Sequence, residues 1–287
     1  MTLASSVQSA ETNLAACLQG QIAIRAGYLR YLDSDKATLE ALNMQIPVGK
    51  WTCILGRSGC GKTSLLRYMA GLLDEVAEWR GELTVNRGQS SNSRVNSHLH
   101  HPISLVNNIA YMAQQDLLMP WLTALENVLL STRFSQVSEH SSEDQNEKAR
   151  HLLQMVGLAD KAHLTPQQLS GGMRQRVALA RTLMQDKPIV LMDEPFSALD
   201  AVTRHRLQNL AYELLQSKTV MLITHDPQEA IRLGHKLYVM QGAPACANHI
   251  ELPPQICTPE TEMPRKYCAD SAVLQQAIID RLEKDYA

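Results

Sequence analysis

The sequence lacks the features that would place it among membrane-spanning, secreted or nucleic-acid-binding proteins. No apolar run reaches the roughly 18 residues that a membrane-spanning helix needs. Residues 1–10 contain neither a basic segment nor a continuous apolar core, so we expect no secretory signal there. The 27 basic and 29 acidic residues leave a net charge of −2 and no broad basic field, which argues against nucleic acid as the main partner.

The sequence also shows no internal repeat, and its six cysteines show no C-x-x-C spacing. What is present is ordinary for a globular protein of 287 residues, with 45% apolar and 20% charged residues. A chain of this length can bury a substantial core, so we expect one large domain.

The most informative segment is a glycine-rich loop at residues 56–63. Its sequence, Gly56-Arg57-Ser58-Gly59-Cys60-Gly61-Lys62-Thr63, matches the phosphate-loop (P-loop) pattern G-x-x-x-x-G-K-[ST] in full. The glycines let backbone amides surround an anion, while Lys62 would reach the β- and γ-phosphates and Thr63 would ligate Mg²⁺. An apolar strand is expected at 51–55 and a helix at 64–70. The alternative is a glycine-rich turn that merely ends in Lys-Thr, and this strand–loop–helix context argues against it.

A second group of candidate residues ends the apolar run at 189–193. Asp193 follows four apolar residues, so we expect it at the carboxyl end of a central parallel strand, where ligands bind in open α/β sheets. Asp193 would hold Mg²⁺ directly or through water, and Glu194 would orient and deprotonate an attacking water. Taken alone, the two acids could equally be the polar end of a strand before Pro195.

A third candidate is the segment Leu169-Ser-Gly-Gly-Met173, which precedes a strongly helical stretch at 174–183. Ser170 is a natural N-cap, and Gly171 and Gly172 leave backbone amides uncovered at the positive end of that helix. Alone, this pattern describes an ordinary capped helix. In a chain with a P-loop, it is a second device for binding an anion.

Together these motifs resemble the nucleotide-binding subunit of an ABC transporter, and the family pattern covers about residues 21–240. The resemblance implies an α/β fold: a P-loop NTPase core with a mostly parallel sheet, an antiparallel β subdomain and a helical signature subdomain. It implies ATP and Mg²⁺ as cofactors, and therefore the reducing cytosol and free thiols. It also implies a homodimer in which Ser170, Gly171 and Gly172 of one copy face the γ-phosphate held by the other.

Smaller motifs resemble the family in the expected order. Tyr31 is similar to the aromatic residue that stacks on adenine, and Gln114 to the glutamine that senses Mg²⁺ and the attacking water, although Gln115 competes for that place. Asp200 belongs to a segment, 197–200, that resembles the D-loop crossing the dimer interface, and His225 is similar to the histidine that contacts the γ-phosphate. The implied catalytic residues are Lys62, Gln114, Glu194 and His225, and the implied nucleotide contacts include residues 56–63 and Ser64.

Residues 116–128 indicate the kind of transporter. The string Pro120-Trp-Leu-Thr, followed by Glu126-Asn-Val128, resembles importers of nitrate, taurine, aliphatic sulfonates and thiamine-precursor pyrimidines. The resemblance implies an integral membrane permease that docks at Pro120–Trp121, a peripheral place on the cytoplasmic face of the inner membrane, and a periplasmic or lipoprotein solute receptor. We expect the apolar residues of this region either to supply docking area or to belong to the subdomain core. These residues are Leu117, Leu118, Met119 and Trp121.

The remaining expectations concern organisation. We expect a mobile N-terminal extension at 1–20, an ATPase domain at 21–242 with its helical subdomain at about 115–185, and a tail at 243–287 with a helix at 272–284. Residues 86–108 should form a His-rich surface loop and residues 135–146 a polar surface connection. Cys60 could have its thiol pKa lowered by loop amides and Lys62, or could simply fill a tight turn.

Two other functions stay open at this stage. A soluble ABC ATPase without a permease, acting in repair, translation or assembly, would share the nucleotide motifs, but the single cassette and the Pro120–Trp121 region count against it. A non-hydrolysing regulatory cassette is disfavoured because Lys62, Glu194 and His225 are all present.

Overall fold

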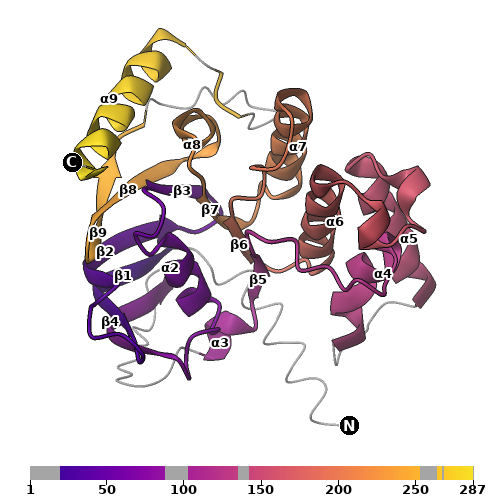
Figure 1. Cartoon of the computed structure of the whole chain (residues 1–287), viewed down its shortest axis with the longest axis horizontal. Coiled ribbons are helices and arrows are strands. Elements are labelled where there is room, and N and C mark those ends of the chain that lie inside the picture. The colour runs from indigo at the N-terminus through magenta and orange to yellow at the C-terminus, as the bar shows by residue number, and fades with distance from the viewer. Residues whose placement is uncertain (1–19, 88–102, 135–141, 253–263, 267, 287) are drawn as a thin grey trace.

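The computed structural model describes residues 20–87, 103–134, 142–252, 264–266 and 268–286. One nine-stranded mixed sheet runs through it in the order β4-β1-β2-β9-β8-β3-β7-β6-β5, with helices packed around it (Figure 1). The expected α/β class is therefore confirmed. Residues 1–19 of the expected N-terminal extension lie outside the described residues, as do the histidines of the expected His-rich loop, His98, His100 and His101.

The middle and one edge of the sheet are parallel. These strands are β3 (Trp51–Gly56), β5 (Ile109–Met112), β6 (Ile189–Asp193), β7 (Thr219–Ile223) and β8 (Lys236–Gly242). All of β3, β6 and β7 is buried, because helices or strands cover both faces. Alternate side chains enter different cores: Trp51 and Cys53 pack in one hydrophobic cluster and Ile54 in the other. This is why these strands are continuous apolar runs in the sequence.

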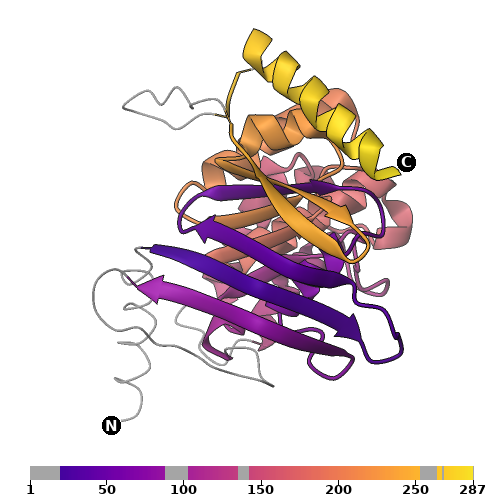
Figure 2. The same ribbon diagram turned by 90° about the vertical axis from the view of Figure 1, so that its left-hand side faces the viewer.

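The other edge is an antiparallel group, seen face-on in Figure 2. It contains β1 (Gly20–Tyr31), β2 (Leu39–Pro47) and β4 (Ala77–Arg87), with β1 paired to both of its neighbours. Strand β9 (Ala245–Ile250) pairs antiparallel with β8 and meets β2 at its other side. The sheet thus continues beyond residue 242, where the ATPase domain was expected to end, because the backbone of β9 completes the ladder between β8 and β2.

Helices connect these strands. After the P-loop comes α2 (Lys62–Met69), and α3 (Ile103–Val106) precedes β5. The helical subdomain contains α4 (Ala124–Val128), α5 (Ser142–Met155), α6 (Gly171–Met184) and the 3-10 helices Leu129–Phe134, Ala159–Lys161 and Pro166–Gln168. It lies on the β5–β6 side of the sheet in Figure 1, opposite the antiparallel strands. The remaining helices are α7 (Ala201–Leu214), α8 (Pro227–Leu233) and α9 (Ala269–Tyr286).

Several expected boundaries were wrong. The loop expected at 86–108 is shortened at both ends, because Asn86 and Arg87 extend β4 and 103–106 form α3. Residues 142–146 belong to α5 rather than to a surface connection, and two acids in its first turn favour a helix start there. The C-terminal helix spans Ala269–Tyr286 instead of 272–284. No helix in the described ranges is both long and apolar enough to cross a membrane.

Candidate functional site

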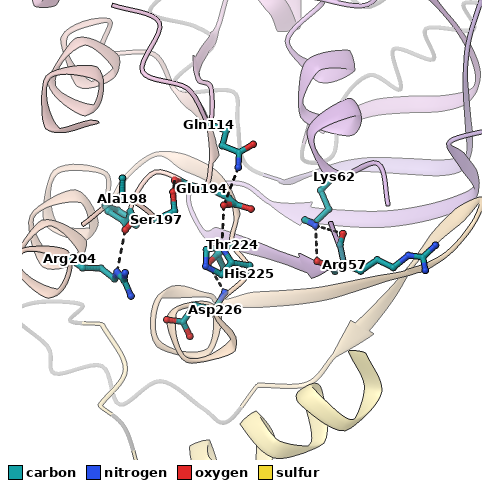
Figure 3. Close-up of polar contacts among 12 residues, drawn as sticks. Arg57, Lys62, Gln114, Glu194, Ser197, Ala198, Arg204, Thr224, His225 and Asp226 are labelled. Carbon is teal, nitrogen blue, oxygen red and sulfur yellow. Dashed lines mark hydrogen bonds and ion pairs between the residues drawn. The ribbon is translucent and has the colours of Figure 1, made fainter. Parts of the chain in front are cut away.

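The P-loop lies between β3 and α2, as predicted. The Lys62 side chain is buried, with 7% of the residue exposed. Its Nζ donates to the backbone carbonyls of Gly56 and Arg57, both at 2.7 Å (Figure 3). The ammonium group is therefore folded back across the loop, where it could exchange these carbonyls for phosphate oxygens.

Gly61 shows why the loop requires glycine. It is the N-cap of α2, with a left-handed φ of 102° that L side chains rarely adopt. A Cβ atom at this position would lie 2.8 Å from side-chain atoms of Thr38 and of Leu39. Gly61 therefore lets the chain turn into α2, whose first amides suit an anion approaching the positive end of the helix.

Asp193 ends β6 and is 1% exposed. Burial raises the pKa of its carboxyl group, the neighbouring Glu194 charge raises it further, and a hydrogen bond from the Thr63 side chain lowers it. Its Oδ2 is buried without a hydrogen-bond partner. A free carboxylate oxygen beside a hydroxyl is a donor set that fits Mg²⁺, which takes only one or two protein ligands at phosphate sites.

Glu194 is the centre of a polar cluster (Figure 3). Its Oε2 lies 3.1 Å from Nδ1 of His225 and accepts a 3.4 Å hydrogen bond from Nε2 of Gln114. Gln114 follows β5, Glu194 follows β6 and His225 follows β7, so adjacent parallel strands bring the three side chains to one edge of the sheet. The structure thus brings together three predicted residues from distant parts of the sequence.

Tyr31 also lies beside the P-loop. Its hydroxyl is 2.9 Å from Oγ of Ser64 in the first turn of α2, so the end of β1 contacts the P-loop helix.

Cys60 does not have the lowered thiol pKa that was one of its two expected properties. Only 5% of the residue is exposed, and burial raises the pKa of its thiol despite the opposing effect of Lys62. The structure therefore favours the alternative in which Cys60 simply fills a tight turn, because the effect of burial on the thiol pKa outweighs that of the nearby positive charge.

The signature segment, which we define as residues 170–172, lies apart from the P-loop of its own chain. Ser170 caps α6, with its Oγ accepting from the Met173 amide at 3.3 Å. Ser170 and Gly171 are exposed, and α6 lies across β5 and β6 from α2 in Figure 1. Within the described part of the chain, no hydrogen bond joins residues 170–172 to the P-loop. The two anion-binding devices do not meet in one copy.

Gln175 is a site residue that the sequence did not reveal. It is 5% exposed, and its Nε2 donates to the Glu194 carbonyl at 3.0 Å while its Oε1 accepts from the Ala198 amide at 3.1 Å. It therefore ties the signature helix α6 to both Glu194 and the D-loop. Asp200, also in the D-loop, caps α7 by accepting from the Thr203 amide, and this hydrogen bond lowers its carboxyl pKa. Only the buried environment of Gln175 distinguishes it from an ordinary helical glutamine.

The Pro120–Trp121 region forms an ordered surface loop. Trp121 is 73% and Leu117 53% exposed, whereas Leu118 is buried in the core and Met119 is half-buried. Leu118 therefore belongs to the core alternative. The fully buried Asn127 holds the loop: its Oδ1 accepts from the Met119 amide at 2.8 Å. Its Nδ2 donates to the carbonyls of Met119, Leu122 and Thr123.

Comparison with known proteins gives consistent matches. A family model described as ABC transporter matches residues 39–197. An uncharacterized ABC transporter ATP-binding protein of Haemophilus influenzae is 40% identical over 251 residues, which cover 87% of this chain and 94% of that protein. The aliphatic sulfonates import ATP-binding protein SsuB 1 of Mesorhizobium japonicum is 35% identical over 250 residues, 86% of this chain and 84% of that protein.

A solved structure shows the same likeness in three dimensions. It is the dimeric post-hydrolysis state of the ATP-binding cassette MJ0796, bound to ADP and phosphate. It superposes with a TM-score of 0.68 at 30% identity and covers 81% of this chain and 99% of its own.

Proposed function

This chain belongs to the ABC transporter family, and from that premise we propose that it powers an import system by coupling MgATP binding and hydrolysis to solute uptake through a membrane permease. The family and its relatives identify it as an ATP-binding transport ATPase of the importer type. One observation carries the mechanistic part: Gln114 and His225 converge on the Glu194 carboxylate, next to the buried Asp193.

The proposed nucleotide site uses the chain's own groups as follows. Tyr31 stacks on the adenine, and Lys62 leaves the Gly56 and Arg57 carbonyls to bind phosphate oxygens. Thr63 and the unpartnered Oδ2 of Asp193 would hold Mg²⁺, which would neutralise charge on the phosphates. The groups proposed to bind the phosphates and Mg²⁺ therefore lie at the carboxyl ends of β3 and β6, and Tyr31 lies at the end of β1.

The proposed hydrolytic groups are those around Glu194. Its carboxylate takes the proton of the attacking water. Gln114 and His225 hold that carboxylate from two sides, and they would also contact the water and the γ-phosphate once nucleotide is bound. Stabilisation of charge by positioned donors supplies the rest of the rate enhancement.

We propose a homodimer because one copy cannot bring both anion-binding devices together. Ser170 and Gly171 are exposed on α6, and a second copy would place its own signature amides against the γ-phosphate. Asp200 and the rest of the D-loop would lie at the dimer interface. The relative cassette MJ0796, which is similar in fold, was solved as a dimer bound to ADP and phosphate.

We propose that the permease docks on the loop at Pro120–Trp121. The exposed Trp121 and Leu117 offer apolar area of the kind that anchors protein interfaces. Docking there would place the ATPase peripherally on the cytoplasmic face of the cell membrane. ATP-driven closure and reopening of the dimer would then move the permease between two states.

The solute class is inferred from relatives and from the resemblance of residues 116–128 to certain importers. The protein of Mesorhizobium japonicum is named for the import of aliphatic sulfonates. We propose a small organic anion such as a sulfonate, or a thiamine-precursor pyrimidine, delivered by a periplasmic or lipoprotein receptor. The ATPase subunit does not contact the solute, so its residues do not select between them.

The substitution Glu194→Gln tests the proposed hydrolytic role. It keeps the size and hydrogen-bonding capacity of the side chain but removes the base, so hydrolysis should fall roughly 10² to 10⁴-fold. ATP binding should persist, and MgATP should trap a closed dimer visible by size-exclusion chromatography. The matched control is Glu213→Gln, an exposed glutamate on α7. Wild-type hydrolysis in Glu194→Gln would remove Glu194 from this role.

A further inference from the structure

The C-terminal helix α9 packs on the ATPase core. Leu274, Ile278 and Leu282 recur at helical spacing and join the hydrophobic cluster beneath α8 and β8, with Ile278 only 1% exposed. The Gln241 side chain at the end of β8 donates to the Arg281 carbonyl at 2.9 Å. Figure 1 shows α9 beside α8 and β8, with its C-terminal end close to the antiparallel strands.

The last turn of α9 contacts the P-loop through Asp285. Its Oδ1 accepts from the Gly242 amide at 2.7 Å, and its backbone carbonyl accepts from Nη1 of Arg57 at 3.1 Å. Its Oδ2 lies 3.6 Å from Nε of Arg57. The Asp285 side chain is 10% exposed and that of Arg57 32%, so the pair is partly shielded from water.

These contacts bridge two adjacent strand ends. Strands β3 and β8 are parallel neighbours, with Gly56 opposite Met240 in the register. Gly242 ends β8, and Arg57 is the first residue after β3. Asp285 therefore contacts both strand ends at the point where the chain enters the P-loop, Gly242 through its carboxylate and Arg57 through its carboxylate and its backbone carbonyl.

Arg57 is also the residue whose carbonyl receives the Lys62 ammonium. Its side chain extends away from the Glu194 cluster in Figure 3, so it does not face the hydrolytic groups. Its backbone belongs to the phosphate cradle while its side chain is held by α9. Movement of Arg57 would consequently displace the first amides of the cradle.

We propose that Asp285 is a positioning residue for nucleotide binding, which acts through Arg57 to hold the entry of the P-loop. The inference rests on the proposed nucleotide site and adds a distant segment to it. The tail helix supports affinity for the nucleotide, whereas the hydrolytic groups that follow β5, β6 and β7 are independent of it.

The test is the substitution Asp285→Asn in the full chain. The asparagine oxygen can still accept from Gly242, so the change removes mainly the charge opposite Arg57. The Kd for ATP should rise about fivefold, the effect of a partly shielded ion pair, while kcat at saturating ATP stays unchanged. The matched control is Glu283→Gln, an exposed acid in the same turn, which should alter neither value.

A double-mutant cycle tests the route through Arg57. In an Arg57→Ala background, Asp285→Asn should add no further increase in Kd. A wild-type Kd in Asp285→Asn, an equal increase in both backgrounds, or a loss of kcat together with a lowered Tm would overturn the proposal. Failure of the wild-type chain itself to bind ATP would instead refute the proposed function.

Discussion

Asn127 offers a sharp test of how the Pro120–Trp121 loop is held. The substitution Asn127→Ala removes an amide group that is fully buried and bonded to three loop residues, while the exposed side chains of the loop stay unchanged. If the loop is the permease docking surface, its shape depends on this residue more than on any exposed one. The variant should therefore separate hydrolysis from coupling.

The magnitude follows from the geometry. Asn127 Oδ1 accepts one hydrogen bond at 2.8 Å, and Nδ2 approaches three carbonyls at 3.2, 3.1 and 3.0 Å. An amide nitrogen carries two hydrogens, so the three approaches amount to about two bonds and the total to about three. At ~1 kcal/mol net for each bond, the substitution should cost ~3 kcal/mol of local loop stability. Because Met119, Leu122 and Thr123 are partly exposed, the freed backbone groups can regain water and the cost should not exceed this.

Hydrogen exchange at the amides of residues 119 and 122 measures the loop directly, and they should exchange roughly 100-fold faster, as ~3 kcal/mol implies. Basal ATPase activity of the isolated subunit should persist, whereas stimulation by the permease should be lost. The control is Asn146→Ala, an exposed asparagine of α5 whose side chain donates to the Ser142 carbonyl in its own helix. Unchanged exchange together with full stimulation would refute the reasoning.

Two further predictions concern ionisable groups whose pKa values are shifted by their surroundings. Asp193→Asn should abolish Mg²⁺-dependent hydrolysis yet raise the Tm of the nucleotide-free protein. Because burial raises the pKa of Asp193 in the folded state, the increase in Tm should be largest above that pKa and should shrink as the pH falls through it. A lower Tm of the variant at neutral pH would contradict this prediction. Alkylation followed by mass spectrometry should modify the exposed Cys268, whose thiol pKa is lowered by Ser271, before the buried Cys60, whose pKa is raised, and the reverse order would contradict this.

Elements with strong local signals could be predicted from the sequence. The run at 51–55 became β3, the run ending at Asp193 became β6, and Ser170 caps α6, because burial on both faces and N-capping leave clear patterns in a short window. The P-loop could also be recognised without tertiary information, because its pattern lies within residues 56–63 and Gly61 adopts a left-handed φ of 102° that favours glycine. These are local physical constraints.

The residues that were missed act across the fold. Gln175 and Asp285 are polar side chains with partners far away in the sequence, and Asn127, although it belongs to the string Glu126-Asn-Val128, holds the loop only because packing buries it. Nothing in their sequence context separates them from solvent-facing residues of a helix. For the same reason β9 was assigned to the tail, because its role comes from pairing with β8 rather than from its mixed composition.

Asp193 and Glu194 are adjacent in the chain but meet opposite surroundings, and the backbone between them explains why. Asp193 completes β6 and stays buried, whereas Glu194 has a φ of 49°, which is costly for a residue with a side chain. The Ile223 carbonyl accepts from its amide at 3.0 Å, while Gln175 and Ser197 donate to its carbonyl. This hydrogen-bonded turn directs the Glu194 carboxylate toward Gln114 and His225. Asp193 therefore has a buried environment suited to a cation, whereas Glu194 has a polar environment suited to proton transfer. Two successive carboxylates on an ordinary extended strand would point to opposite faces of the sheet, so the strained turn is what lets them serve one site.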